Sequence, residues 1–108
     1  RLSEGISSVD CVVLPLFDKE GMPELAREIT SAINALPHSR AEMDTSKSIG
    51  RRYARADEIG VPWALTVDHT SMEDGSVTIR RRDDQLQVRA LVDEILVRMT
   101  NGTMQELF

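Results

Sequence analysis

The stretch "SIGRRYARADEIGVPWALTVD", residues 48–68, joins an arginine-rich segment directly to a continuous apolar run. The run "VPWALTV" (61–67) has almost no polar alternation, which is typical of a strand covered on both faces of a sheet. In the segment before it, apolar residues recur at helical spacing: Ile49, Tyr53, Ala56 and Ile59. Gly60 is placed to end such a helix in a left-handed turn. The junction therefore predicts an arginine-rich helix that leads into a central strand.

The sequence before this junction repeats the same alternation. "CVVLPLF" (11–17) is a second β-branched apolar run, and residues 22–36 carry apolar side chains at the spacing of a helix. "SRAEMD" (39–44) alternates between small or apolar and charged residues, as a strand with one buried face does. Strands that alternate with helices in this way form parallel pairs.

The sequence after the junction predicts a hairpin. "HTSMEDGS" (69–76) is a polar turn, and "SVTIRRR" (76–82) alternates apolar and polar residues as a strand that returns beside 61–67. The predicted order is βαβαββα, which belongs to the α/β class: a mixed sheet covered by helices. We expect one domain over residues 1–108.

A last helix is predicted from Asp83 or Asp84, acting as a cap, to about Met99. Its expected core contacts are Leu86, Leu91, Ile95 and Leu96. The residues beyond it, "NGTMQELF" (101–108), are expected to be a frayed or truncated tail.

Composition narrows the classes of function. The chain has 108 residues and a formal net charge of -5, which argues against a general nucleic-acid coat or a membrane-surface protein. Cys11 is the single cysteine and lies in an apolar run, so we expect a buried thiol and no disulfide. No apolar stretch approaches the roughly 18 residues of a membrane span. The sequence does not begin with methionine, and we expect it to be a segment of a longer protein.

Catalytic motifs are missing from the sequence. There is no Walker loop, dinucleotide-binding glycine pattern or G-x-S-x-G elbow. His38 and His69 have no partners at zinc-ligand spacing, so no metal site is predicted. The paired acidic residues are adjacent in sequence and do not face a common point on a helix or turn.

The arginines form two clusters. Arg51, Arg52 and Arg55 are close together on the predicted helix, and Arg80 and Arg82 share one face of the predicted hairpin strand. Two interpretations remain open from the pattern alone: an anion-binding surface, or a solvated face partly neutralised by nearby carboxylates.

Residues 48–68, together with "VTIRRRDDQLQVRALVDEI" (77–95), resemble the C-terminal anticodon-binding domain of glycyl-tRNA synthetases of the dimeric type found in eukaryotes, archaea and some bacteria. The resemblance covers nearly the whole chain, with "CVVLPLF" similar to the first strand of that domain. It implies a three-layer fold with about five strands and three helices. It also implies that this domain binds the anticodon loop of glycine tRNA and does not catalyse.

The resemblance implies a set of anticodon contacts: Arg51, Thr66, Asp68 and His69, with Arg52, Arg80 and Arg82 as further contacts. His69 stands where animal enzymes of the family carry an aromatic ring. Unpaired bases are commonly stacked on aromatic or guanidinium planes. Phe17 and Phe108 are expected to lie outside this site, so arginine side chains and His69 would provide the stacking.

For the parent protein, the resemblance implies a glycine–tRNA ligase that uses ATP and magnesium in an upstream catalytic domain, with no cofactor in this domain. It further implies a homodimer formed through other regions and a cytoplasmic location, with an organellar form as the alternative; no membrane association is expected. The alternative function is a protein-interaction or accessory module of the same fold, as in a polymerase accessory subunit or a synthetase-like regulatory protein.

Overall fold

The computed structural model describes residues 9–17, 21–37, 39–44 and 60–108. The predicted helix before Gly60, with Arg51 and Arg52, lies outside the described residues, as does His38. Among the helices that are described, none is long and apolar enough to cross a membrane.

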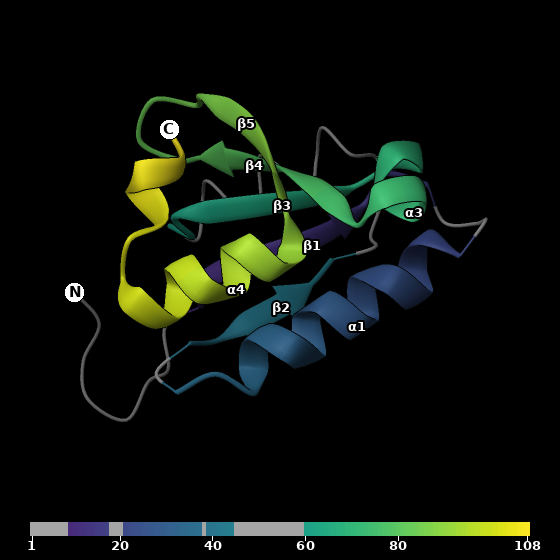
Figure 1. Cartoon of the computed structure of the whole chain (residues 1–108), viewed down its shortest axis with the longest axis horizontal. Helices are drawn as coiled ribbons and strands as arrows, with labels where there is room; N and C mark the ends of the chain where they lie inside the picture. The colour runs from purple at the N-terminus through teal and green to yellow at the C-terminus, as the bar shows by residue number, and fades with distance from the viewer. Residues whose placement is uncertain (1–8, 18–20, 38, 45–59) are drawn as a thin grey trace.

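The centre of the molecule is a five-stranded mixed sheet (Figure 1). Its strands are β1 (Cys11–Pro15), β2 (Ala41–Met43), β3 (Trp63–Val67), β4 (Ser76–Arg81) and β5 (Gln87–Leu91). They lie in the order β2-β1-β3-β4-β5. β1 is parallel to β2 and β3, whereas β4 is antiparallel to β3 and β5. The predicted fold class is confirmed, because the described residues form a mixed sheet that is accompanied by three α-helices.

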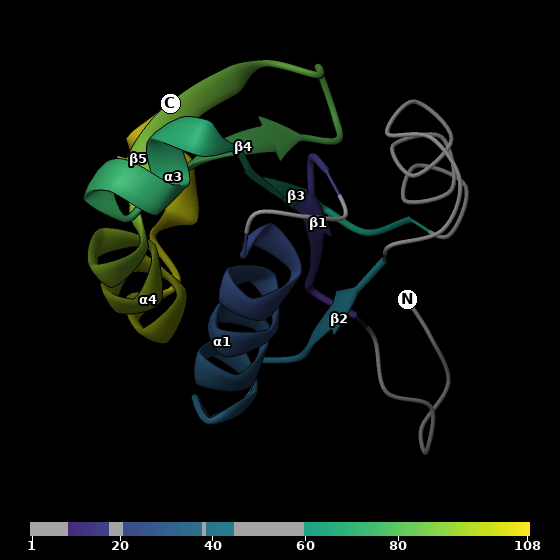
Figure 2. The ribbon, with the colours of Figure 1, turned by 90° about the vertical axis from the view of Figure 1, so that its right-hand side faces the viewer.

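Two helices, α1 (Met22–Asn34) and α4 (Val92–Asn101), pack against the same face of the sheet (Figures 1 and 2). The buried core between them and the sheet contains Cys11, Val13, Leu65, Val67, Val77, Ile79, Ile29, Ile33 and Ile95. Burial raises the pKa of the Cys11 thiol, so this cysteine is the buried, unreactive group that the sequence predicts. On the opposite face of the sheet, Val12, Leu14 and Ala64 form a second buried cluster with Val61.

Residues 69–76 differ from the prediction of a polar turn. His69–Asp74 form a short helix, α3, at the carboxyl end of β3 (Figure 1). Asp68 caps it by accepting a hydrogen bond from the Ser71 amide, while the Ser71 hydroxyl accepts one from the Asp68 amide. This reciprocal capping box satisfies two backbone N–H groups that a polar turn would leave to water. Gly75 ends the helix with a φ of 75°, a conformation that favours glycine.

The last helix begins later than predicted, at Val92 and not at Asp83 or Asp84. Asp84 does not cap a helix; its carboxylate accepts hydrogen bonds from the Arg81 side chain and the Leu86 amide, which closes a tight loop. β5 follows, with Val88 and Ala90 turned to the core. The expected core roles of Leu86 and Leu91 are wrong, since both residues are 52% exposed. The apolar residues fit a helical spacing over 86–96, but within 87–91 they alternate with exposed residues as in a strand.

The C-terminal residues form a short 3-10 helix, Met104–Leu107, and the prediction of a frayed tail is wrong. Met104 is buried, and the Phe108 ring stacks on Trp63 with 5.7 Å between ring centroids. The Arg81 guanidinium lies 4.5 Å from the centroid of the Phe108 ring, within the range of a cation–π contact. The tail is therefore held against the end of the sheet.

Candidate nucleic-acid interface

The sheet face opposite α1 and α4 becomes polar toward β5. Cross-strand partners share a face, so the register of β3, β4 and β5 sets Thr66, Thr78 and Arg89 in one row. The next row consists of Ala64, Arg80 and Gln87. We call the side chains of Thr66, Asp68, Thr78, Arg80, Gln87 and Arg89 the polar sheet face. Thr66 is buried within it, whereas Gln87 and Arg89 are exposed at its outer strand.

Asp68 and Arg89 form the centre of this face. Arg89 Nη2 donates to Asp68 Oδ2 and, at 3.2 Å, to the Thr78 hydroxyl. Arg89 Nη1 donates to the Ser76 hydroxyl at 2.7 Å, and that hydroxyl donates to Asp74 at 2.7 Å. One guanidinium thus links the end of β3 to β4 and β5, which holds three strands in a fixed relation at the edge of the candidate site.

The Asp68 carboxylate is both charged and oriented. Burial alone would raise the pKa of Asp68, but hydrogen bonds from Arg89 and from Ser71 lower it below its usual range. A carboxylate has about four acceptor positions. Ser71 uses two of them on Oδ1 through its amide and hydroxyl, and Arg89 uses one on Oδ2. Counting the donors among the described residues, an acceptor position on Oδ2 therefore remains for a ligand.

His69 lies beside an aromatic ring. Its ring centroid is 5.8 Å from that of Phe17, with the planes inclined at 48°. Phe17 follows β1 as His69 follows β3, and the Leu16 amide donates to the Val67 carbonyl at 2.8 Å, so the two strand ends are joined. Phe17, which was expected outside the site, lies beside His69 where the ends of β1 and β3 are joined.

The predicted arginine contacts are spread along the face. Arg80 is paired with Ala64, and the Arg82 amide donates to the Pro62 carbonyl at 3.0 Å. Pro62 precedes Asp68 by six positions, which corresponds to about 20 Å along a strand. Arg82 is therefore at the opposite end of the face from Asp68, and Arg80 lies between them. Arg51 and Arg52 are outside the described residues.

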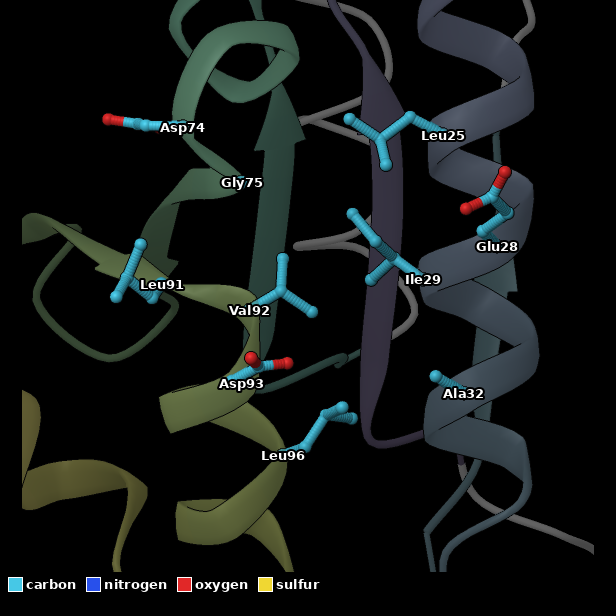
Figure 3. Close-up of a pocket in the computed structure, with 10 residues that line it drawn as sticks. All are labelled: Leu25, Glu28, Ile29, Ala32, Asp74, Gly75, Leu91, Val92, Asp93 and Leu96. Carbon is cyan, nitrogen blue, oxygen red and sulfur yellow. The ribbon is translucent and has the colours of Figure 1, made fainter.

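A groove of about 400 Å³ lies on the other side of the sheet, between α1 and α4 (Figure 3). Its apolar walls include Leu25, Ile29 and Ala32 on α1 and Val92 and Leu96 on α4. The remaining charged groups are the carboxylates of Glu28, Asp74 and Asp93, and the described lining residues include no lysine or arginine. RNA phosphates would be repelled there. The polar sheet face is therefore the better candidate for RNA.

Sequence reasoning missed Arg89 and Phe17. The predicted helix includes Arg89, and only the alternation of Gln87, Arg89 and Leu91 with Val88 and Ala90 indicates a strand face. No motif or spacing in the sequence around Phe17 indicates a binding role. Its importance follows from the parallel pairing of β1 and β3, which brings residues about 50 positions apart to one edge.

Comparisons with known proteins identify the family of this chain. A family model described as an anticodon binding domain matches residues 10–101. Glycine–tRNA ligase of Methanothermobacter thermautotrophicus is 50% identical over 96 residues, covering 89% of this chain and 17% of the relative. The Treponema denticola ligase is 40% identical over 99 residues, covering 92% of this chain and 22% of the relative. The chain thus spans about a fifth or less of the length of these relatives.

Solved structures show the same fold at low sequence identity. The RNA-binding domain of threonyl-tRNA synthetase from Cryptosporidium parvum has a TM-score of 0.77 at 18% identity, covering 86% of this chain and 23% of that chain. Prolyl-tRNA synthetase from the same organism has a TM-score of 0.78 at 18% identity, covering 92% and 21%. The match of the family model over residues 10–101 shows that the chain belongs to the anticodon-binding domain family.

Proposed function

We propose that this chain is the anticodon-binding domain of a glycine–tRNA ligase and binds the anticodon loop of glycine tRNA. Its similarity to glycine–tRNA ligases supports the assignment. The observation that carries the proposal is the Asp68 carboxylate, which is held charged by Arg89 and Ser71 with acceptor capacity left on the polar sheet face.

Glycine codons begin with two guanines, so glycine tRNA has cytosines at the second and third anticodon positions. Cytosine has an amino donor at N4, which a carboxylate accepts, whereas uracil has an oxygen there that a carboxylate repels. Asp68 is the proposed acceptor for one cytosine. A guanidinium donates to the N3 and O2 acceptors of the base, and the proposed donors are Arg51, Arg52, Arg80 and Arg82, with His69 and Thr66 as neighbouring contacts.

For the whole protein we infer ATP-dependent attachment of glycine to tRNA by a catalytic domain outside this chain. Magnesium and ATP would serve that domain, and the anticodon-binding domain would hold no cofactor. The same inference, from the similarity to glycine–tRNA ligases, extends to a homodimer formed through other regions and to a cytoplasmic or organellar location.

The test is a binding titration of this domain with anticodon stem-loops at fixed salt. Replacing either cytosine with uracil should weaken binding by about 1 to 3 kcal/mol per position. Asp68→Asn should reduce the discrimination at one of the two positions, because an amide can also donate to the uracil oxygen.

Two controls separate sequence reading from charge. Raising the salt should weaken native and substituted loops by the same factor, because phosphate contacts do not depend on the base. Equal affinity for native and doubly substituted loops would contradict anticodon recognition and would favour an accessory or protein-interaction module.

A further inference from the structure

An exposed aromatic ring lies at the carboxyl end of β1. Phe17 is 43% exposed, while Trp63 and Phe108 stack on each other at the other end of the sheet. Among the phenylalanine, tyrosine and tryptophan side chains in the described part of the chain, Phe17 is exposed, whereas Trp63 and Phe108 are half-buried. A single exposed apolar side chain is common in proteins and has no meaning by itself.

The surroundings of Phe17 indicate a role for this exposed ring. Its ring lies beside that of His69, which directly follows Asp68 at the start of α3. Asp68 is held by Arg89 and Ser71, and this oriented carboxylate and the two rings lie at the joined ends of β1 and β3. A flat apolar surface beside a polar acceptor fits a nucleobase, which has apolar faces and a polar edge.

We propose that Phe17 supplies a stacking surface for one unpaired base of the bound RNA, next to His69, while Asp68 contacts the edge of that base or of its neighbour. This inference rests on the proposed function and adds a residue to that site. Stacking on a phenylalanine ring does not select the base, because every base has a π face. Phe17 therefore contributes affinity and position, and the polar side chains contribute the discrimination.

The experiment measures binding of the domain to the native anticodon stem-loop with Phe17→Leu and Phe17→Trp. Leucine keeps the apolar volume but removes the flat face, so affinity should fall by roughly tenfold. Tryptophan keeps a planar ring and should bind within about threefold of the original protein. Val97→Ala, at a 57% exposed position on α4, is the control for a general loss of exposed apolar surface and should leave affinity unchanged.

A set of stem-loops, each abasic at one loop position, then identifies the stacked base. At that position the abasic loop should bind Phe17→Leu and the original protein equally, because the partner of the ring is already missing. At the other positions the roughly tenfold difference should persist. Urea midpoints of the variants exclude unfolding as the cause.

The outcomes separate this inference from the proposed function. If the original protein discriminates cytosine from uracil but Phe17→Leu binds as tightly as Phe17→Trp, the stacking role is wrong and anticodon binding stands. The stacking role would also be overturned if Phe17→Leu bound every abasic loop more weakly than the original protein by the same factor. If the original protein shows no preference for the native loop, the proposed function itself fails.

Discussion

The two surfaces of the sheet have opposite chemistry. The polar sheet face carries hydroxyls and arginines around one fixed carboxylate, whereas the groove between α1 and α4 carries three carboxylates on apolar walls. A net charge of -5 describes neither surface. The one acidic side chain of the polar sheet face is ion-paired with Arg89, so it presents an acceptor without an uncompensated negative charge. The distribution of charge, and not its sum, predicts which surface meets RNA.

The largest effect should come from the core that separates the two surfaces. Ile95 on α4 is 1% exposed, and Ile95→Ala should lower the free energy of unfolding by about 2 to 5 kcal/mol. Val97→Ala, two residues away on the exposed side of the same helix, should change it by less than about 0.5 kcal/mol. Urea unfolding followed by circular dichroism measures both. A similar loss for the two variants would mean that α4 does not pack as described.

Arg89→Leu should destabilise the fold by removing the guanidinium at the centre of the polar sheet face. The change removes donors from Asp68, Thr78 and Ser76, and we expect a loss of about 1 to 2 kcal/mol in the free energy of unfolding. Anticodon stem-loop binding should weaken as well, because Asp68 loses the group that orients it. Arg89→Lys keeps the charge, but an ammonium group lacks the planar guanidinium that donates to these partners at the same time.

Arg89→Lys should therefore recover the salt dependence of RNA binding without recovering its full affinity. Chemical denaturation and stem-loop titration distinguish the contribution of the charge from that of the guanidinium hydrogen bonds. Full recovery by lysine in both measurements would show that only the charge of Arg89 matters.

The sequence predicted the parallel part of the fold better than its hairpin part. The β-branched runs that became β1 and β3 are buried on both faces, so their pattern is continuous and strong. β5 is an outer strand with an exposed face, and its alternating residues, Val88 and Ala90 against Gln87 and Arg89, fall within the predicted helix. Its start depends on the loop closed by Asp84 and Arg81, which spacing alone does not reveal.

The candidate site was predictable only where it is local. Thr66, Asp68 and His69 are consecutive or nearly so, and the family resemblance located them together. Phe17 and Arg89 join them through strand pairing, parallel for one and antiparallel for the other. Tertiary pairing of this kind leaves no periodic signal in a single sequence.

Phe108→Ala tests whether the C-terminal tail contributes to folding stability and not to RNA binding at the polar sheet face. The ring contacts Trp63 and Arg81, so its loss should cost about 1 kcal/mol in the free energy of unfolding. Stem-loop affinity should not change, because Arg81 lies on the opposite face of β4 from Arg80. A loss of RNA binding at unchanged stability would place the tail at the interface.

A smaller effect should appear at acidic pH. The pKa of Asp68 is lower in the folded state than in the unfolded chain, where it is about 3.9. Its contribution to stability is therefore complete above that unfolded value and is lost as the pH falls through the folded pKa. Urea midpoints measured from pH 6 to pH 2 should fall more steeply for the original protein than for Asp68→Asn. Parallel curves would indicate that the Asp68 network contributes nothing to folding.

The smallest expected effect comes from neutralising the groove. Glu28→Gln removes a negative charge on the groove side, and Gln87→Glu adds one to the polar sheet face. The helix and sheet layers separate Glu28 from the proposed RNA by about 10 Å or more, beyond the Debye length of roughly 8 Å at physiological ionic strength. Glu28→Gln should therefore change stem-loop affinity by less than about twofold, whereas Gln87→Glu should weaken it several-fold. Both variants alter the net charge by one unit, so the comparison tests location alone. If Glu28→Gln strengthens binding as much as Gln87→Glu weakens it, RNA affinity follows total charge and the assignment of the polar sheet face fails.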